Sequence, residues 1–138
     1  MVITSYKWQE IEGVYPGIFS EFFPDETLNP ADAPAMVYVG QQEDIIGFLA
    51  GYFHNLETLY IQRIGLRQDL RGKQLTMGFF VEAVEYLRRQ GIRYLIGAIE
   101  NTNRAALIAA LKAGFLVNGC RVDTRGKLFV EMIIKINE

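Results

Sequence analysis

The segment at residues 66–80 has the sequence LRQDLRGKQLTMGFF. It joins the end of an apolar, strand-like segment to the start of a helix-like segment through a polar loop that contains Gly72. A helix N-terminus presents unpaired backbone N–H groups, and a glycine before it lets the backbone approach an anion closely. Four basic residues surround the loop: Arg63, Arg67, Arg71 and Lys73. The stretch therefore predicts either an anion-binding loop or a solvated basic turn.

The loop carries neither of the two common nucleotide-binding glycine patterns. The chain lacks the G-x-x-x-x-G-K-[ST] motif of P-loop proteins and the G-x-G-x-x-G motif of Rossmann turns. The residues of the loop alone leave its function open.

Hydrophobic periodicity around this loop predicts a single layer of strands with helices between them. Residues 8–23 are expected to form two short helices, broken near Gly13 or Pro16. A further helix is predicted at 75–90, with Phe79, Ala83 and Leu87 along one face and Glu85 four residues before Arg89 on the other. Another helix is predicted at 101–115, and strands are predicted at 2–7, 35–41, 44–53, 58–66, 92–99, 115–123 and 127–137. The strand at 92–99 is apolar on both faces in its second half, which predicts a strand covered on both sides. No repeat or composition break divides the chain, so residues 1–138 are predicted to be one mixed α/β domain.

Composition and charge narrow the class of protein. The chain has 138 residues, half of them hydrophobic, with a net charge of −2 and a sequence pI of about 5.5. These values fit one domain with its own core and disfavour a nucleic-acid binder, which usually carries a basic surface. No apolar run reaches the ~18 residues of a membrane span, and no signal-peptide pattern is found. We therefore expect a cytoplasmic domain without a nucleic-acid or membrane partner.

The single cysteine and the single histidine limit the sites that the chain can build. Cys120 cannot form an internal disulfide, and its distance in sequence from His54 argues against a zinc site. No metal is predicted, and Cys120 is expected to be a small buried residue on a strand.

Two blocks of residues carry a resemblance to a known family. L-R-Q-D-L-R-G-K-Q-L-T, residues 66–76, resembles the pattern V-x-P-x-[YF]-R-G-K-G-[IL]-[GA] of the Gcn5-related N-acetyltransferase (GNAT) family. N-R-A-A-L-I-A-A-L-K-A-G-F, residues 103–115, resembles that family's N-x-x-[AS]-x-x-[LF]-Y-[EK]-K-x-G-F. The spacing of the blocks and the order of predicted elements also match.

The resemblance implies an acyl-CoA N-acyltransferase-like fold, with a mostly antiparallel sheet flanked by helices, and acetyl-CoA as co-substrate. It implies that the loop's backbone holds the pyrophosphate: Arg71, Gly72, Lys73, Gln74, Leu75 and Thr76. It also implies that strand 58–66 bulges and splays from strand 92–99, leaving a gap for the pantetheine arm. Backbone groups near Ile64 and Leu66 would contact that arm, and Asn103 would hydrogen-bond it.

The chain departs from the family pattern at four positions. Gln74 stands where the family's loop usually has glycine, and Thr76 stands where it usually has glycine or alanine. Ala110 stands where many members place a tyrosine that protonates the leaving thiolate, and Ala98 lies near the place of a glutamate base. The resemblance therefore implies an N-acetyltransferase that works by direct ternary-complex transfer, or a GNAT-shaped binding or regulatory module that has lost catalysis.

Tyr60 and Gln62, on strand 58–66, are the candidate catalytic residues. A water molecule held by either side chain would receive the proton of the attacking amine, although Tyr60 is also explained as a half-buried packing residue. Glu57 and His54 remain alternatives, and His54 is expected in a β-turn, where histidine is commonly a surface residue. Glu100, after strand 92–99, is instead a candidate helix-end or acceptor contact.

The acceptor is expected to be a small-molecule or peptide amine. Acidic residues in 8–34 would attract a cationic amine, or would form a solvated face over an aromatic core. The apolar C-terminal stretch LFVEMIIKI, residues 128–136, could pair between chains as an exposed strand edge, which would give a homodimer.

Overall fold

The structure is a computed structural model that describes residues 1–23, 36–67 and 75–138. Its strands are β1 (Val2–Lys7), β2 (Met36–Gln42), β3 (Asp44–Asn55), β4 (Thr58–Leu66), β5 (Tyr94–Glu100), β6 (Leu116–Val122) and β7 (Leu128–Lys135). Its helices are α1 (Trp8–Val14), α2 (Ile18–Phe22), α3 (Leu75–Arg89) and α4 (Arg104–Lys112). The strands form one sheet in the order β1-β2-β3-β4-β5-β7-β6. Neighbouring strands are antiparallel except β4 and β5, which are parallel, so the predicted mixed, mostly antiparallel α/β fold is confirmed.

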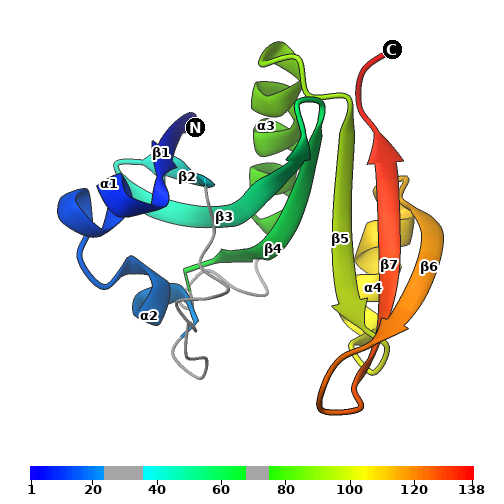
Figure 1. Cartoon of the computed structure of the whole chain (residues 1–138). Coiled ribbons are helices and arrows are strands. Elements are labelled where there is room, and N and C mark those ends of the chain that lie inside the picture. The colour runs from blue at the N-terminus through cyan, green and yellow to red at the C-terminus, as the bar shows by residue number, and fades with distance from the viewer. Residues whose placement is uncertain (24–35, 68–74) are drawn as a thin grey trace.

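Helices α3 and α4 cover one face of the sheet, and α1 and α2 pack on the other face beside β1–β3 (Figure 1). The predicted apolar face of α3 is confirmed, because Phe79, Ala83 and Leu87 are fully buried. They pack against Leu49 of β3 and Leu95 of β5, so α3 bridges the two halves of the sheet from behind. Arg88, rather than Arg89, forms the helix-surface ion pair with Glu85.

A pair of glycines makes room for the largest side chain on that helix. Gly40 of β2 and Gly47 of β3 lie opposite each other in the sheet. A Cβ atom added to either glycine would lie closer than 3.0 Å to the ring of Phe79. The ring therefore fills a slot that exists only because both positions lack a side chain.

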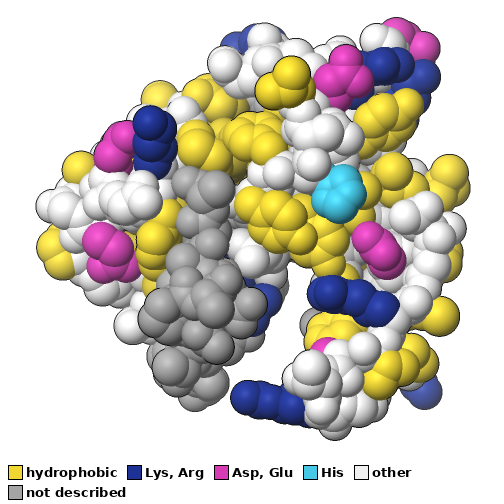
Figure 2. Space-filling model, viewed as in Figure 1, with side chains coloured by type: hydrophobic (Ala, Val, Ile, Leu, Met, Phe, Trp, Pro, Cys, Tyr) yellow, Lys and Arg dark blue, Asp and Glu magenta, His cyan; other side chains and the backbone are white. Residues whose placement is uncertain are grey.

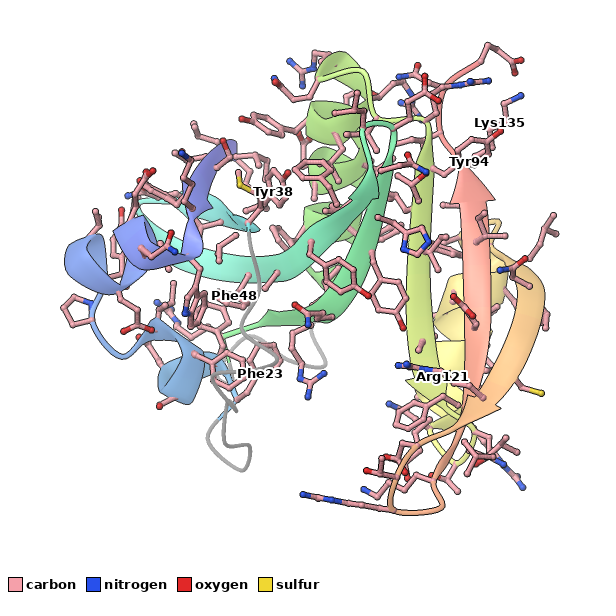
Figure 3. The ribbon with its side chains drawn as sticks, viewed as in Figure 1. Phe23, Tyr38, Phe48, Tyr94, Arg121 and Lys135 are labelled. Carbon is pink, nitrogen blue, oxygen red and sulfur yellow. The ribbon has the colours of Figure 1, made fainter. Side chains whose placement is uncertain are left out.

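The second core lies under α1 and α2. The helices are separated at residues 15–17, where Gly17 adopts φ +76°, which confirms the predicted break. Phe19, Phe22 and Phe23 surround Phe48 of β3, with ring centroids 5.3–6.3 Å apart in this cluster. Phe23 and Phe48 are labelled in Figure 3, where they lie between α2 and the sheet. Aromatic packing thus holds these two short helices on the sheet.

Three expectations about the strands are corrected. Only Leu95 of β5 is buried, and the other residues of that strand are half-exposed, so β5 is not covered on both faces by the described residues. Cys120 is exposed, as is every residue of β6, which lies at the edge of the sheet. β7 lies between β5 and β6 and has no free edge, so an edge-to-edge dimer through residues 128–135 is ruled out.

Tyr38 makes the stability of this fold sensitive to alkaline pH. Burial, together with the neighbouring Tyr86, raises the pKa of Tyr38 from 10.0 to about 12. Because the pKa of Tyr38 is higher in the folded protein than in the unfolded chain, protonated Tyr38 stabilises the fold. This contribution is complete at a pH below the unfolded-state pKa and is lost as the pH rises through the folded-state pKa. We expect unfolding free energy to fall by up to about 3 kcal/mol between pH ~10 and ~12, at about 1.4 kcal/mol per pKa unit.

The Tyr38→Phe variant should lose less stability over the same interval, because it has no hydroxyl to ionise at this buried position. Urea unfolding of both proteins at pH ~8.5 and ~11.5 measures the difference. Equal losses in the two proteins would show that Tyr38 does not carry the alkaline transition.

Candidate functional site

The candidate site is a gap in the middle of the sheet between β4 and β5. The two strands pair from Thr58↔Tyr94 to Ile61↔Gly97, and the pairing then stops. β4 continues to Leu66 and β5 to Glu100, and their ribbons diverge in Figure 1. The splay that the resemblance implied is therefore present. Beyond Ile61, the side of β4 that faces away from β3 has no strand partner in the described chain.

A bulge in β4 lies where the splay begins. Ala50 of β3 pairs with Arg63 and Gly51 pairs with Ile61, so Gln62 is an extra residue on β4. A bulge increases local twist and bends its strand, which turns β4 away from β5 at this point. Ile61 and Ile64 both pack against the core on the α3 side although they are three residues apart, so the strand's two-residue alternation is broken here.

Gly51 permits this arrangement. A Cβ atom at Gly51 would lie closer than 3.0 Å to the backbone carbonyl oxygen of Tyr60. The backbone of β4 therefore sits where a side chain of β3 would otherwise be.

Tyr60 stands on β4 directly before the splay. Its ring stacks on Tyr52 with centroids 5.1 Å apart and planes at 17°, and the guanidinium carbon of Arg121 lies 6.0 Å from the Tyr60 ring centre. Its hydroxyl is buried and has no hydrogen-bond partner among the described residues. An enclosed hydroxyl next to the gap is a natural contact for a ligand or a bound water.

Burial raises the pKa of Tyr60 above its ordinary value of 10.0. The positive charge of Arg121 opposes this shift, and the negative charge of Glu131 and the neighbouring Tyr52 add to it. Tyr60 is therefore a neutral phenol at physiological pH, able to donate or accept a hydrogen bond but not to act as an anionic base.

Gln62 lies at the bulge itself, and its side-chain oxygen is buried. The backbone carbonyl of Gln62 accepts a hydrogen bond of 2.7 Å from Nη1 of Arg63. Both predicted catalytic residues thus border the place where β4 leaves β5.

The predicted pyrophosphate loop is only partly within the described residues. Arg71, Gly72, Lys73 and Gln74 lie outside them, whereas Leu75 and Thr76 are the first residues of α3. The helix therefore starts shortly after β4 ends, as predicted. Ile64 and Leu66 lie on the splayed part of β4, where they pair with Leu49 and Gly47 of β3.

Arg67, one of the basic residues near the loop, is already held by a carboxylate. Its Nη1 lies 2.7 Å from Oδ2 of Asp44, at the start of β3. This ion pair ties the end of β4 to the neighbouring strand and reduces the positive charge that Arg67 offers to an anion.

Asn103 caps helix α4 on the other side of the gap. Its side-chain oxygen accepts a hydrogen bond of 3.2 Å from the backbone N–H of Ala106. The cap fixes the side chain and leaves its amide N–H₂ group as the part that could donate to a ligand.

Two of the alternative residues have other contacts. The carboxylate of Glu57 lies 3.2 Å from Nη1 of Arg93. His54 is exposed near the end of β3 and does not lie in the turn between β3 and β4, so its predicted place is corrected. Glu100 ends β5, and its backbone carbonyl accepts a hydrogen bond of 2.9 Å from the N–H of Asn103.

The structure brings two further side chains to this place that the sequence did not reveal. Glu131 of β7 lies opposite Ala98 of β5, and Arg121 of β6 lies opposite Phe129 of β7. In Figure 3, Arg121 reaches from β6 toward the middle of the sheet, where its guanidinium carbon also lies 5.6 Å from the ring of Phe129. The available signal for Glu131 was its position as the single acid within the apolar stretch of residues 128–136.

The face of the molecule that carries the candidate site is apolar at its centre (Figure 2). Hydrophobic side chains gather in the middle of the face shown in Figure 2, and the surface is hollowed below them, with basic side chains along the rim. Among the described residues, no three His, Cys, Asp or Glu side chains are grouped so that they could hold a metal ion. No helix in the described part of the chain has the length and apolarity needed to cross a membrane.

Comparisons with solved structures place this architecture among acetyltransferases. An IAA acetyltransferase from Bacillus cereus is similar over 97% of this chain and 98% of its own, with 17% identity and a TM-score of 0.74. The ribosomal-protein-S18-alanine N-acetyltransferase from Escherichia coli covers 99% of this chain and 94% of its own, with 16% identity and a TM-score of 0.69. A mutant of the spermidine N-acetyltransferase from Vibrio cholerae covers 99% and 95%, with 12% identity and a TM-score of 0.77.

At these identities the structural matches establish the fold alone. None of the curated proteins matches the sequence significantly. The family model described as "Acetyltransferase (GNAT) family" matches residues 4–115, which is most of the chain. The chain therefore belongs to the GNAT family of acetyl-CoA-dependent N-acetyltransferases.

Proposed function

We propose that residues 1–138 act as one catalytic domain that transfers the acetyl group of acetyl-CoA to a primary amine within a ternary complex. The observation that carries the proposal is the splay of β4 from β5 after Ile61, with the bulge at Gln62 and the buried hydroxyl of Tyr60 beside it. The gap between β4 and β5 has unpaired strand backbone on one side, which suits an extended chain that carries amide groups, as the pantetheine arm does.

The binding part of the proposal uses both sides of the gap. Residues 71–76 would hold the pyrophosphate with backbone N–H groups before and at the start of α3. Backbone groups near Ile64 and Leu66 would contact the pantetheine arm, and the amide of Asn103 would donate to it from the start of α4. The role of residues 71–76 rests on the family pattern. The roles near Ile64, Leu66 and Asn103 rest on that pattern and on the position of these three residues beside the splay.

In the proposed chemistry, the amine nitrogen attacks the thioester carbonyl carbon, whose oxygen is polarised by a backbone N–H near Leu66. The carbon–nitrogen bond forms, the carbon–sulfur bond breaks, and CoA leaves as the thiolate. Tyr60 stays protonated, so its part is to hold the amine or a water through hydrogen bonds, with Gln62 beside it. Positioning of the two substrates supplies much of the rate, since Ala98 and Ala110 carry no proton-transfer group.

The acceptor that we propose is a small-molecule or peptide amine. Two of the proteins with a similar fold are named for acetylation of spermidine and of the alanine of ribosomal protein S18. Several acids on α1 and α2 lie on the side of the sheet that carries Tyr60 and support attraction of a cationic amine: Glu10, Glu12 and Glu21.

The proposal is tested by calorimetric titration with acetyl-CoA, followed by an assay of thiol release with a panel of amines. We expect a dissociation constant on the order of micromolar, loss of binding in a Gly72→Glu variant, and amine-dependent thiol release. The added carboxylate would repel the pyrophosphate from the loop. A Glu82→Gln variant on the exposed face of α3 serves as a control that should bind normally.

A second function is favoured by Ala98 and Ala110, which lack the usual proton-transfer groups. A catalytically degenerate GNAT module would bind acetyl-CoA without releasing thiol for any amine in the panel. Absence of binding in the intact protein would contradict the acetyltransferase proposal itself.

A further inference from the structure

We propose that Glu131 is the group that accepts the proton of the attacking amine; this inference rests on the acetyl transfer proposed above. The last β4–β5 pair is Ile61↔Gly97, so Ala98 is the first residue of β5 beside the open gap. Glu131 lies directly opposite Ala98 on β7. Opposite residues in antiparallel strands have Cβ atoms about 5 Å apart, so the carboxylate stands one strand away from the start of the splay.

Glu131 and Tyr60 are on the same face of the sheet. Tyr60 pairs with Ile96, and Ile96 pairs with Ile133, two residues from Glu131. Leu95 and Met132, which alternate with them, are buried in the core against α3. The face that carries Glu131 is therefore the one opposite α3, where Tyr60 stacks on Tyr52. The effect of the Glu131 charge on the pKa of Tyr60 agrees with this placement.

The Glu131 carboxylate is not neutralised by a neighbour in the described part of the chain. It is half-buried and forms no hydrogen bond or ion pair with another described residue. Arg121, the basic residue on the neighbouring strand, lies over the rings of Tyr60 and Phe129. A half-buried carboxylate without a cationic partner attracts an ammonium group more strongly than a fully solvated one.

Other acids near the gap are less suited to the task. Glu57 is paired with Arg93. Glu100 lies opposite Phe129 at the end of β5, two residues farther along the splay than Ala98. Of these three acids, Glu131 is the one opposite the residue that follows the last β4–β5 pair, and it is the one whose charge acts on Tyr60.

The primary ammonium binds between Glu131 and Tyr60, and one proton passes from its nitrogen to the Glu131 carboxylate, directly or through one water. The neutral amine attacks the thioester carbonyl carbon, the carbon–nitrogen bond forms, and the carbon–sulfur bond breaks with release of the CoA thiolate. The amide nitrogen loses its second proton to solvent or to the thiolate, and Glu131 returns its proton to solvent.

The test compares Glu131→Gln, Glu131→Asp and Glu100→Gln with the intact chain. Acetyl-CoA affinity is measured by calorimetry, and thiol release is measured with the best amine from the panel, at several pH values. We expect Glu131→Gln to bind acetyl-CoA normally and to lower kcat by about 100-fold or more near neutral pH. Glu131→Asp should keep part of the rate, and Glu100→Gln should keep most of it.

The pH profile separates proton transfer from a structural effect. Raising the pH toward the pKa of the amine should restore the rate of Glu131→Gln, because more amine is then already deprotonated, and a peptide α-amine with pKa about 8 should recover earlier than a side-chain amine near 10.4. The other described charged or titratable groups on this face are the same in both proteins: Tyr52, His54 (Figure 2), Tyr60, Tyr94, Glu100, Arg121 and Lys135.

Three outcomes would overturn the inference. A Glu131→Gln variant with an unchanged rate, or with a raised KM for the amine and an unchanged kcat, would remove Glu131 from proton transfer while leaving the acetyltransferase proposal intact. A lowered rate that no increase in pH restores would assign Glu131 a structural role. If the intact chain neither binds acetyl-CoA nor releases thiol, the proposed function fails first, and this inference fails with it.

Discussion

The Phe79→Ala variant is expected to lose about 3–5 kcal/mol of unfolding free energy, the largest change among the substitutions considered. Phe79 is fully buried at the centre of the core between α3 and the sheet. Its ring fills the slot formed by Gly40 and Gly47, and neither glycine has a side chain that could move into the space left behind. The loss therefore includes both the transfer of the ring and the cavity that remains.

Urea or guanidinium unfolding, followed by circular dichroism, measures this loss. The matched control is Gly78→Ala, at the neighbouring position of α3, where an added Cβ meets nothing within 4 Å. Alanine is the better helix former by about 1 kcal/mol, so that variant should be as stable as the parent or more so. A loss below about 1 kcal/mol for Phe79→Ala would mean that the sheet and helix close the slot by moving together.

The Gly51→Ala variant is expected to lose about 1–3 kcal/mol of stability and most of the acetyl-transfer rate. The new Cβ would collide with the backbone carbonyl oxygen of Tyr60, and a backbone atom cannot turn aside as a side chain can. β4 must therefore shift at Tyr60, two residues before the bulge at Gln62, which displaces the Tyr60 side chain from the gap. A 1 Å displacement of a positioning group can cost on the order of 100-fold in rate.

Unfolding curves and thiol-release rates, measured on the same preparation, test both parts. Gly97→Ala provides the stability control on the neighbouring strand, because its nearest neighbour would be the Ile61 carbonyl oxygen at an ordinary 3.9 Å. If Gly51→Ala kept the rate and stability of the parent, the close approach of the two strands would have no part in holding Tyr60.

Much of the fold could be predicted from local sequence patterns. The apolar spacing of residues 75–90 identified the buried face of α3. Pro16 marked the break between α1 and α2, whereas Gly13, the other predicted position, lies within α1. The strand-to-helix junction at residues 66–80 was also found at the expected place. These features depend on residues that are close in sequence, where period and turn chemistry act directly.

The parts that were missed depend on which strands become neighbours. Glu131 and Tyr60 share a site because β5 separates their strands in the sheet, and no local pattern connects positions so far apart in the chain. Cys120 lies in a stretch with the composition of a buried strand, but β6 is placed at the sheet edge, where it remains exposed. The apolar second half of β5 predicted a strand covered on both faces, whereas no described helix covers the face of β5 opposite α3 and α4 (Figure 1).

The short β4–β5 pairing also has a consequence for the cooperativity of unfolding. Within the residues that the structure describes, the sheet contact between β1–β4 and the unit of β5, β7 and β6 consists of four residue pairs, Thr58↔Tyr94 to Ile61↔Gly97. Regions joined by few contacts can open separately at a free energy below that of global unfolding. A ligand that lies across the gap binds only while both units are closed, so it raises the free energy of that opening by mass action. In the described chain, β1–β4 and the unit of β5, β7 and β6 are held together by α3 and these four residue pairs. A ligand in the gap would add a further link between them, so that they unfold together more often.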